Sequence, residues 1–436
     1  MRQRQARPRL LQAMIDAFSL PDLRRRILIT VGLLVAFRFV AHVPLPGVDL
    51  GALQDLFDRN AMLGMFDMFS GGAMRRLSVA AMGVYPYIMA SIIMQLMVPI
   101  IPQLRALSEE GESGRNRINL ITHWAAVPLA ALQGYGQLIL FQREGVFAGG
   151  AALPMAAAVI SMVAGTMFCI WLGELITEYG IGNGISLIIF GGIVAGLPEM
   201  VGQGFLAKED IGGLIAYLLL AIATIVFIVI FTEAHRRIPV QYARSTFRGG
   251  RMYRQSGSTH IPLRVNTAGM IPIIFAMSIV IFPGILASYF TSPDGVGVAA
   301  FIVKLFNPSA AMPLGLFYWG LYFLLVIAFA FFYTTVIFQQ QDLPGVLQRQ
   351  GGFVPGIRPG KHTATYLNGI ISRITWAGAL FLALVAVVPF LTREITNVQV
   401  IQMSSLGLLI MVGVVLDTMK QLESHLVLRR YEGFIK

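Results

Sequence analysis

Ten hydrophobic runs, each able to cross a lipid bilayer, divide this sequence of 436 residues. A transmembrane helix needs about 20 mostly apolar residues. The runs cover residues 27–43, 77–98, 118–140, 154–176, 185–203, 213–232, 267–290, 313–337, 374–391 and 399–419. Charged residues make up only 13% of the chain, against about 25% in soluble domains. The sequence therefore predicts an all-α polytopic membrane protein with ten transmembrane helices.

Positive charge is concentrated in alternate connecting segments. Residues 1–26, 99–117, 233–266, 338–373 and 420–436 hold 25 of the 33 lysines and arginines. Cytoplasmic loops of membrane proteins carry such an excess, so these segments, including both termini, are predicted to face the cytoplasm.

The Gly-rich outer loop at residues 204–212 separates five spans from five. Because five is odd, the halves at 27–203 and 213–419 cross the membrane in opposite senses, which is typical of an inverted repeat. The halves show no convincing sequence identity, so topology alone supports the repeat. Inverted repeats usually hold their working site at the interface of the halves, near the middle of the membrane.

Residues 62–75 carry an apolar segment that is too short to span a membrane. It ends in Gly71, Gly72 and Arg75, and we expect it to enter the membrane and turn back. Irregular backbone at membrane depth survives only where protein or a water-filled cavity surrounds it, so the segment implies a central cavity. Val84 and Ile88 stand four residues apart on the next predicted span, and one helix face would present both to that cavity.

Two cytoplasmic loops are unusually basic. In residues 233–266, seven arginines flank a Gly249-Gly250 turn, which predicts a projecting β-hairpin. In residues 351–361, Pro359 keeps Arg358 out of helical geometry, so Arg358 is predicted at a loop tip. Such loops also orient a chain in the membrane, but seven arginines exceed that need and suit an anionic partner, either RNA or an acidic protein face.

Ionisable residues are rare at the centres of the spans, which argues against an ion-coupled pump. Arg38 falls near the outer end of the first run, where we expect it to reach toward the lipid headgroups. His123 has no histidine or carboxylate at helical spacing to pair with, and we expect a packing role. The chain contains no phosphate-binding loop, metal-spaced cluster or nucleophile elbow. We therefore expect no enzymatic activity, cofactor or metal.

Four segments resemble the SecY family of protein-translocation channels. They are LGMFDMFSGGA with YPYIMASIIMQL at 63–96, YGIGNGISLIIFGGIVAGLP at 179–198, LRVNTAGMIPIIFAMSIVIFP at 263–283, and FVPGIRPGKHTATYL at 353–367. The GIRPG form is similar to bacterial members. The resemblance covers nearly the whole chain and implies a channel for secretory and membrane proteins in the cell (plasma) membrane.

The resemblance also implies roles for individual residues. A plug that closes the channel from the outer side corresponds to residues 62–75, with Met65, Phe66, Met68, Phe69, Ser70, Gly71 and Gly72. A pore ring corresponds to Val84, Ile88, Ile185, Ile189, Ile274 and Ile410, with Leu406 as an alternative in the last span. A lateral gate between spans 2 and 7 corresponds to Ser91, Gln95, Ile274 and Ser278, with residues 204–212 as its hinge.

The family's partners are implied in the same way. They are the membrane subunits SecE and SecG, the SecA motor ATPase or a ribosome, and signal peptides with unfolded polypeptide as substrate. The residues that would bind the motor or the ribosome are Arg236, Arg237, Arg244, Arg248, Arg251, Arg254, Arg358 and Lys361. Two alternatives stay open from the residues alone: an inverted-repeat secondary transporter of a small solute, and a structural membrane scaffold.

Overall fold

The structure is a computed structural model that describes residues 20–59, 63, 67, 70–147, 152–206, 211–248, 251–288, 290, 297–308, 310, 313–341, 343–396 and 405–432. The first half contains α2 (Pro21–Val40), α3 (Leu50–Arg59), the 3-10 helix η1 (Met74–Arg76), α5 (Tyr85–Met97), α6 (Pro102–Glu109), α7 (Glu112–Arg143), α8 (Ala152–Tyr179) and α9 (Gly184–Leu206). The second half contains α10 (Ile211–Glu233), β1 (His235–Arg248), β2 (Arg251–Arg264), α11 (Ile271–Ser288), α12 (Val298–Leu305), α13 (Leu314–Gln341), α14 (Leu343–Arg349), β3 (Gly352–Phe353), α15 (Lys361–Thr396) and α16 (Ser405–Glu432).

Each of the ten predicted spans overlaps one helix, in the order α2, α5, α7, α8, α9, α10, α11, α13, α15 and α16. Among the described residues, four helical stretches are long and apolar enough to cross a membrane unaided: α7, α8, α13 continued by α14, and α15. The pair α5 and α6 makes a further candidate, bent by 98° where Pro102 starts α6. Shorter apolar helices lie within α9, α10 and α11.

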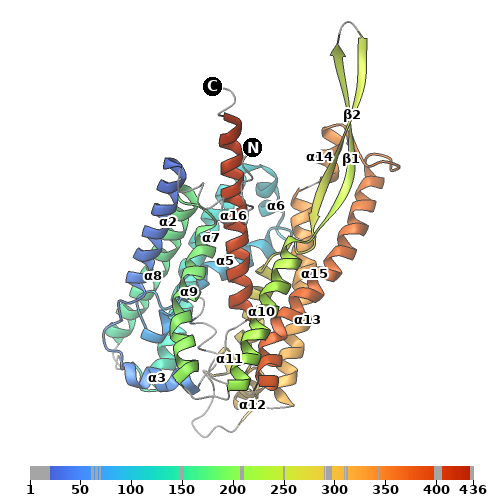
Figure 1. Ribbon diagram of the computed structural model, residues 1–436. Helices are drawn as coiled ribbons and strands as arrows, with labels where there is room; N and C mark the ends of the chain where they lie inside the picture. Colours follow the sequence, from blue (N-terminus) through green and yellow to red (C-terminus); the bar gives the residue numbers. More distant parts are fainter. Residues whose placement is uncertain are drawn as a thin grey trace, which may run out of the picture.

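The helices pack mainly within their own half. In the first half, α8 packs against α2, α7 and α9, and α7 packs against α5. In the second half, α15 packs against α10, α13 and α16. Figure 1 shows these two groups side by side, and α16, which also packs against α9, joins them.

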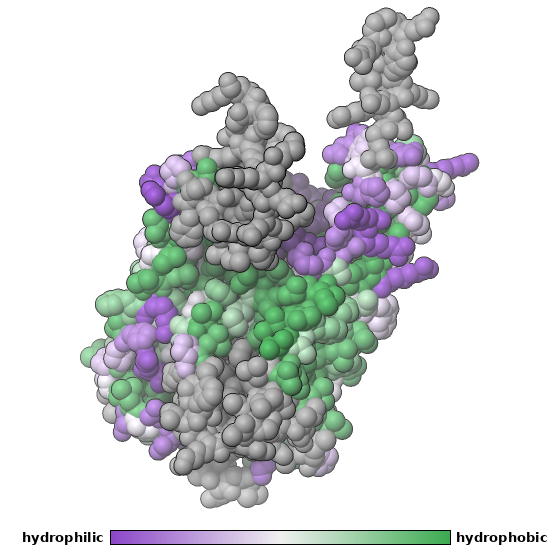
Figure 2. Space-filling model, in the orientation of Figure 1, coloured by the Kyte–Doolittle hydropathy of each residue, from purple (hydrophilic) through white to green (hydrophobic). Residues whose placement is uncertain are grey.

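The two ends of the bundle differ. The start of α2 and the end of α16 lie at the end from which β1 and β2 project, whereas α3 and α12 lie at the opposite end (Figure 1). A hydrophobic band crosses the middle of the face seen in Figure 2, and hydrophilic residues gather beside the base of the two strands. This arrangement suits a membrane-embedded middle with the basic loops beyond one surface of the lipid.

The second predicted span begins later than expected. The sequence predicts a helix from residue 77, but α5 starts at Tyr85. The residues before it instead pair with the chain after α2: Leu45 N donates to Leu77 O at 3.0 Å, and Val79 N donates to Val43 O at 3.0 Å. These bonds commit the backbone of this stretch to another segment, so it cannot continue a helix.

Pro86 marks the start of α5. Proline lacks an N–H and is tolerated in the first turn of a helix, where no intrahelical partner is available. Val84 is therefore the N-cap residue of α5, not a residue inside the helix. The N–H of Ile88 donates to Val84 O at 3.1 Å, so the two residues still stand one turn apart.

The predicted β-hairpin is confirmed. β1 and β2 are antiparallel, from His235 opposite Arg264 at the base to Arg248 opposite Arg251 at the far end. β3, which was not predicted, adds to β1 and gives the strand order β2-β1-β3. Because β3 belongs to the second basic loop, the two basic loops form one small sheet. Apolar residues under it form a cluster that includes Ile238, Val240, Leu263, Leu347, Val354, Leu367 and Ile370.

Candidate functional site

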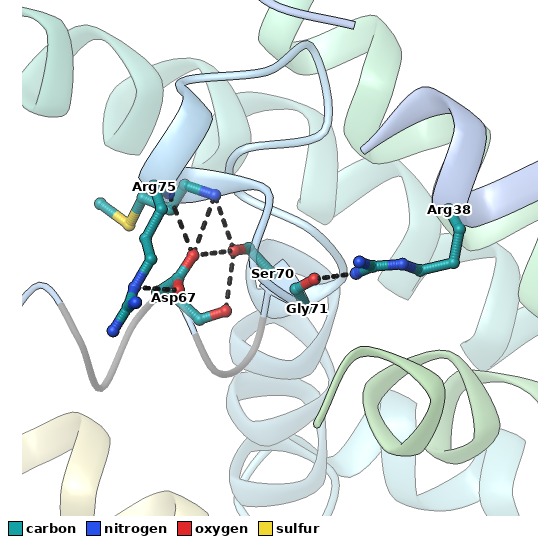
Figure 3. A network of polar contacts seen from close by, with 6 residues as sticks. Arg38, Asp67, Ser70, Gly71 and Arg75 are labelled. Carbon is teal, nitrogen blue, oxygen red and sulfur yellow. Dashed lines mark hydrogen bonds and ion pairs between the residues drawn. The ribbon is translucent and has the colours of Figure 1, made fainter. Parts of the chain in front are cut away.

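A network of polar contacts connects residues at the end of the predicted plug (Figure 3). Asp67 is buried, and its Oδ1 accepts hydrogen bonds from the backbone N–H groups of Met74 and Arg75, both at 3.1 Å. The Ser70 hydroxyl donates to Asp67 O at 2.9 Å, and Arg75 Nε lies 3.2 Å from Asp67 Oδ2. Asp67 therefore satisfies two backbone N–H groups at the start of η1 and pairs with the charge of Arg75, which ties Asp67 to Ser70, Met74 and Arg75.

Three of the seven predicted plug residues, Ser70, Gly71 and Gly72, are described, and they precede η1. Leu63, Asp67 and Ser70 have helical backbone, as expected of a short plug helix. The other four predicted plug residues, Met65, Phe66, Met68 and Phe69, lie outside the described residues. Asp67 itself was missed, although a carboxylate among methionines and phenylalanines is a detectable signal in the sequence.

Arg38 corrects an expectation. The sequence placed its guanidinium among lipid headgroups, but Arg38 Nη1 donates a hydrogen bond to the carbonyl oxygen of Gly71 (Figure 3). The reason is geometric: Arg38 lies in the last turn of α2, and the end of the plug segment passes within reach of it. A buried carbonyl then replaces water as the partner of the charge.

The six predicted ring positions all belong to the large apolar core of the molecule or pack against it. Val84 and Ile410 are fully buried members of that core, Ile189 and Ile274 are nearly so, and Ile88 and Ile185 are half-buried and pack against the core. They come from α5 and its N-cap, α9, α11 and α16, so both halves contribute. Ile410 is a member of this core. The structure does not describe the side chain of the alternative residue, Leu406.

The predicted gate positions occupy α5 and α11. On α5, Gln95 Nε2 donates to Ser91 Oγ at 3.3 Å. On α11, Ile274 and Ser278 are both buried one turn apart. Ser278 is hydrogen-bonded to the side chain of Tyr85 on α5. Tyr85, which the sequence did not single out, therefore supplies a polar contact between the two helices of the predicted gate.

The predicted docking residues lie at the hairpin end of the molecule. Arg236 and Arg237 are exposed at the base of β1. Arg244, Arg248, Arg251 and Arg254 occupy positions along β1 and β2 toward the far end of the hairpin. Arg358 is exposed in a non-helical stretch, as expected, whereas Lys361 is the first residue of α15 rather than part of the loop. Thr363 Oγ1 donates to Arg358 O at 2.9 Å and fixes the loop against α15.

A hollow of about 310 Å³ opens near the base of the hairpin. It is lined by residues of both halves, including Asn183, Arg264, Asp417, Lys420 and Gln421. Arg264 Nη1 lies 3.9 Å from Asp417 Oδ1, and Gly182 N donates to Gln421 Oε1 at 2.8 Å. The hollow therefore adjoins α16 at the same end of the molecule as the docking residues. Within the described residues, no cluster of histidine, cysteine and carboxylate side chains could hold a metal ion.

His123 packs between helices as expected, and it also has a charged partner. It has no histidine or carboxylate partner on its own helix, but His123 Nε2 lies 2.8 Å from Glu174 Oε1 on α8. Its Nδ1 is 2.7 Å from Asn119 O, and its ring packs against Tyr87 with centroids 5.1 Å apart. His123 therefore joins α5, α7 and α8, which spacing along a single helix could not reveal.

The fold and the site define a polytopic α-helical membrane protein with an apolar cluster between its two halves. Residues 78–419 match the family profile described as SecY. The protein translocase subunit SecY of Thermus thermophilus is 43% identical over 442 residues, covering 98% of each chain. Its counterpart in Pseudomonas aeruginosa is 42% identical over 409 residues, covering 92% of this chain and 91% of the relative. The chain belongs to the SecY family.

Solved structures share the fold over nearly the whole chain. One, described as the structure of a protein conducting channel, has a TM-score of 0.65 at 16% identity and covers 94% of this chain and 96% of its own. A second, with a TM-score of 0.65 at 17% identity and the same coverage, concerns a SecY protein whose plug domain stabilises the closed state of the translocation channel and maintains a membrane seal. A third, at 0.63 and 16% with the same coverage, is Sec61 in the canine ribosome-channel complex from the endoplasmic reticulum.

Proposed function

We propose that this chain is the central, protein-conducting subunit of a translocation channel, passing unfolded secretory proteins across the membrane and releasing membrane-protein segments sideways into lipid. Membership in the SecY family over nearly its full length carries this conclusion. It also favours the channel over the small-solute transporter and the structural scaffold. The chain itself catalyses no reaction in this proposal, and a partner supplies the energy.

The six clustered residues Val84, Ile88, Ile185, Ile189, Ile274 and Ile410 are proposed as the pore ring. A passing helix is about 10–12 Å across, yet the idle membrane must hold back ions. Branched apolar side chains resolve this conflict because an apolar constriction excludes water when closed and packs around whatever enters. Their common burial between the two halves supports the assignment.

Residues 62–75 are proposed as the plug on the outer side of the ring. The Asp67 network supports this, because it links Asp67 to Met74 and Arg75 at the end of the segment, so that these residues can move together. A relative in the same fold has a plug domain that maintains a membrane seal.

The seam between α5 and α11 is proposed as the lateral gate. Ser91, Gln95 and Ser278 place polar groups along it, beside the apolar Ile274. Residues 204–212 connect the two halves and would act as the hinge; residues 207–210 lie outside the description.

The basic sheet β2-β1-β3 and Arg358 are proposed to dock the driving partner, either the SecA motor or a ribosome. The apolar cluster beneath the sheet supports this role, because it holds both basic loops in one orientation. SecE and SecG are the proposed membrane partners. The orientation that follows places the hairpin and both termini in the cytoplasm and the chain in the plasma membrane.

Reconstitution tests the function directly. The chain, with its membrane partners in lipid vesicles, should move a secretory precursor into the lumen when the motor and ATP are added. Deleting residues 62–75 should leave a folded channel with a higher resting ion leak. Uptake of a small solute without precursor transport would favour the transporter, and loss of the assembled protein on deletion would make the segment a structural element instead of a plug.

A further inference from the structure

We propose that Arg38 and Gly192 form a seat for the plug, so that the first half of the molecule alone sets the plug's closed position. The seat is defined by the contacts of these two residues with Gly71. This inference rests on the assignment of residues 62–75 as the plug.

The first contact is polar. Arg38 lies half-buried in the last turn of α2 and donates to the Gly71 carbonyl oxygen. A hydrogen bond from a charged donor is about twice as strong as a neutral one, and arginine stays charged under all ordinary conditions. The acceptor belongs to the backbone, so the contact depends on where the plug lies rather than on which side chain it carries.

The second contact is steric. On α9, a Cβ added to Gly192 would lie 2.2 Å from Gly71 Cα, and a Cβ added to Gly71 would lie 2.7 Å from Gly192 Cα. Backbone meets backbone here, so no flexible side chain can move aside. Gly71 also has φ +68, which disfavours other residues at that position. Gly196, one turn further along α9, has no atom within 4 Å of such a Cβ.

Both contacts come from the same half. α2 and α9 pack against each other, and Gly71 lies against Phe37 of α2 as well as against Gly192. The Asp67 network links Asp67 to Met74 and Arg75, on either side of Gly71 in the chain, so holding Gly71 restrains these residues too. Separation of the halves along the α5–α11 seam leaves the seat intact. Release of the plug is therefore a step distinct from opening of the gate.

The test measures plug position by thiol labelling. Leu63 is buried at the start of the plug, and Cys169 is the single native cysteine and is buried in α8. In the complete chain with its membrane partners in vesicles, Leu63→Cys should react slowly with an impermeant thiol reagent while the plug is seated. Cys169 serves as the internal control, because general loosening of the fold would expose it too. Resting ion conductance is measured on the same samples.

The variants come in matched pairs. Arg38→Met should raise labelling at position 63, and the resting conductance, by about tenfold or more, the scale expected for loss of a charge-assisted hydrogen bond. Arg38→Lys should rescue part of this, because it keeps the charge. Arg117→Met removes an exposed arginine on α7, away from the plug and from Arg38, and should change neither reading. Gly192→Ala should act like Arg38→Met, and Gly196→Ala should be silent.

The proposal is wrong if Arg38→Met and Gly192→Ala match their controls while Cys169 stays protected. If Cys169 becomes reactive in Arg38→Met, that variant has lost its fold, and the decision passes to Arg38→Lys and the glycine pair. The proposal is then wrong if labelling at position 63 is the same in Arg38→Lys as in the unaltered chain and the same in Gly192→Ala as in Gly196→Ala. Deletion of residues 62–75 separates the two claims. A leak on deletion combined with silent seat variants refutes the seat alone, whereas no leak on deletion refutes the plug.

Discussion

The side chain of Tyr85, in the first turn of α5, is hydrogen-bonded to the side chain of Ser278 on α11. The two helices belong to different halves, and both residues are next to ring positions: Tyr85 follows Val84, and Ser278 stands one turn after Ile274. Opening of the proposed gate must break this bond. The bond therefore stabilises the closed state and not the open one.

Tyr85→Phe should make the gate easier to open. An intramolecular hydrogen bond contributes about 0.5–1.5 kcal/mol net, which corresponds to a shift of about two- to tenfold toward the open state. Precursors with weakened apolar signals should then be transported more readily, as measured by precursor protected inside vesicles. Ser278→Ala should have a similar effect, and the double variant should add little to either.

Tyr135→Phe, which changes an exposed tyrosine on α7, is the control. Equal transport by Tyr85→Phe, Tyr135→Phe and the unaltered chain would contradict a role for this bond in the gate.

Arg358→Gln should impair engagement of the driving partner and leave membrane insertion intact, because Arg358 is exposed in a non-helical stretch that we propose lies outside the lipid. Transport should fall while the amount of assembled protein stays constant. Arg115→Gln removes another exposed arginine, near the start of α7, and should preserve transport. Reduced insertion or expression of Arg358→Gln would instead support the simpler reading, in which the arginine only orients the chain.

Changing Arg244, Arg248, Arg251 and Arg254 to glutamine should weaken partner binding in a salt-sensitive way. Attraction between exposed charges is screened over about 8–10 Å at moderate salt, so the difference from the unaltered chain should shrink as salt rises. Lysine at the same positions keeps the charge and should retain most of the binding. A loss of binding that is independent of salt would point to damage to the hairpin.

Hydropathy and turn residues were enough to predict the ten spans and the hairpin, and four sequence segments carried the resemblance to a channel family. These features depend on local sequence. The errors concern contacts between distant segments. The late start of α5 depends on bonds from residues 43–45, and the partner of His123 comes from α8. Arg38 looked like a headgroup anchor because its acceptor, the Gly71 carbonyl, belongs to a backbone whose position only the fold reveals.

The predictions about the site divide in the same way, into local features that the sequence indicates and contacts between distant segments that it does not. The ring positions could be named from four-residue spacing and family motifs, but their burial in one cluster from four helices could not. Tyr85 was missed because a tyrosine carries no spacing signal of its own, and Asp67 was missed although a carboxylate stands out in an apolar segment. Each gains its meaning from a partner, Ser278 in one case and the N–H groups of η1 in the other.

The ring is the central claim, and resting ion conductance of the reconstituted complex in a planar bilayer tests it most directly. Ile88→Asn and Ile189→Asn place an amide in the closed apolar cluster, where leaving it unpaired costs about 1–3 kcal/mol. Water reaches the amide only in the open state, so the amide destabilises the closed state. The equilibrium between the closed and open states should shift toward the open state by about tenfold for each 1.4 kcal/mol of this destabilisation. Ile160→Asn changes an exposed isoleucine on α8 and is the control. The account predicts that resting conductance rises in both ring variants and stays unchanged in the control. Folded ring variants that conduct no more than the control would contradict it.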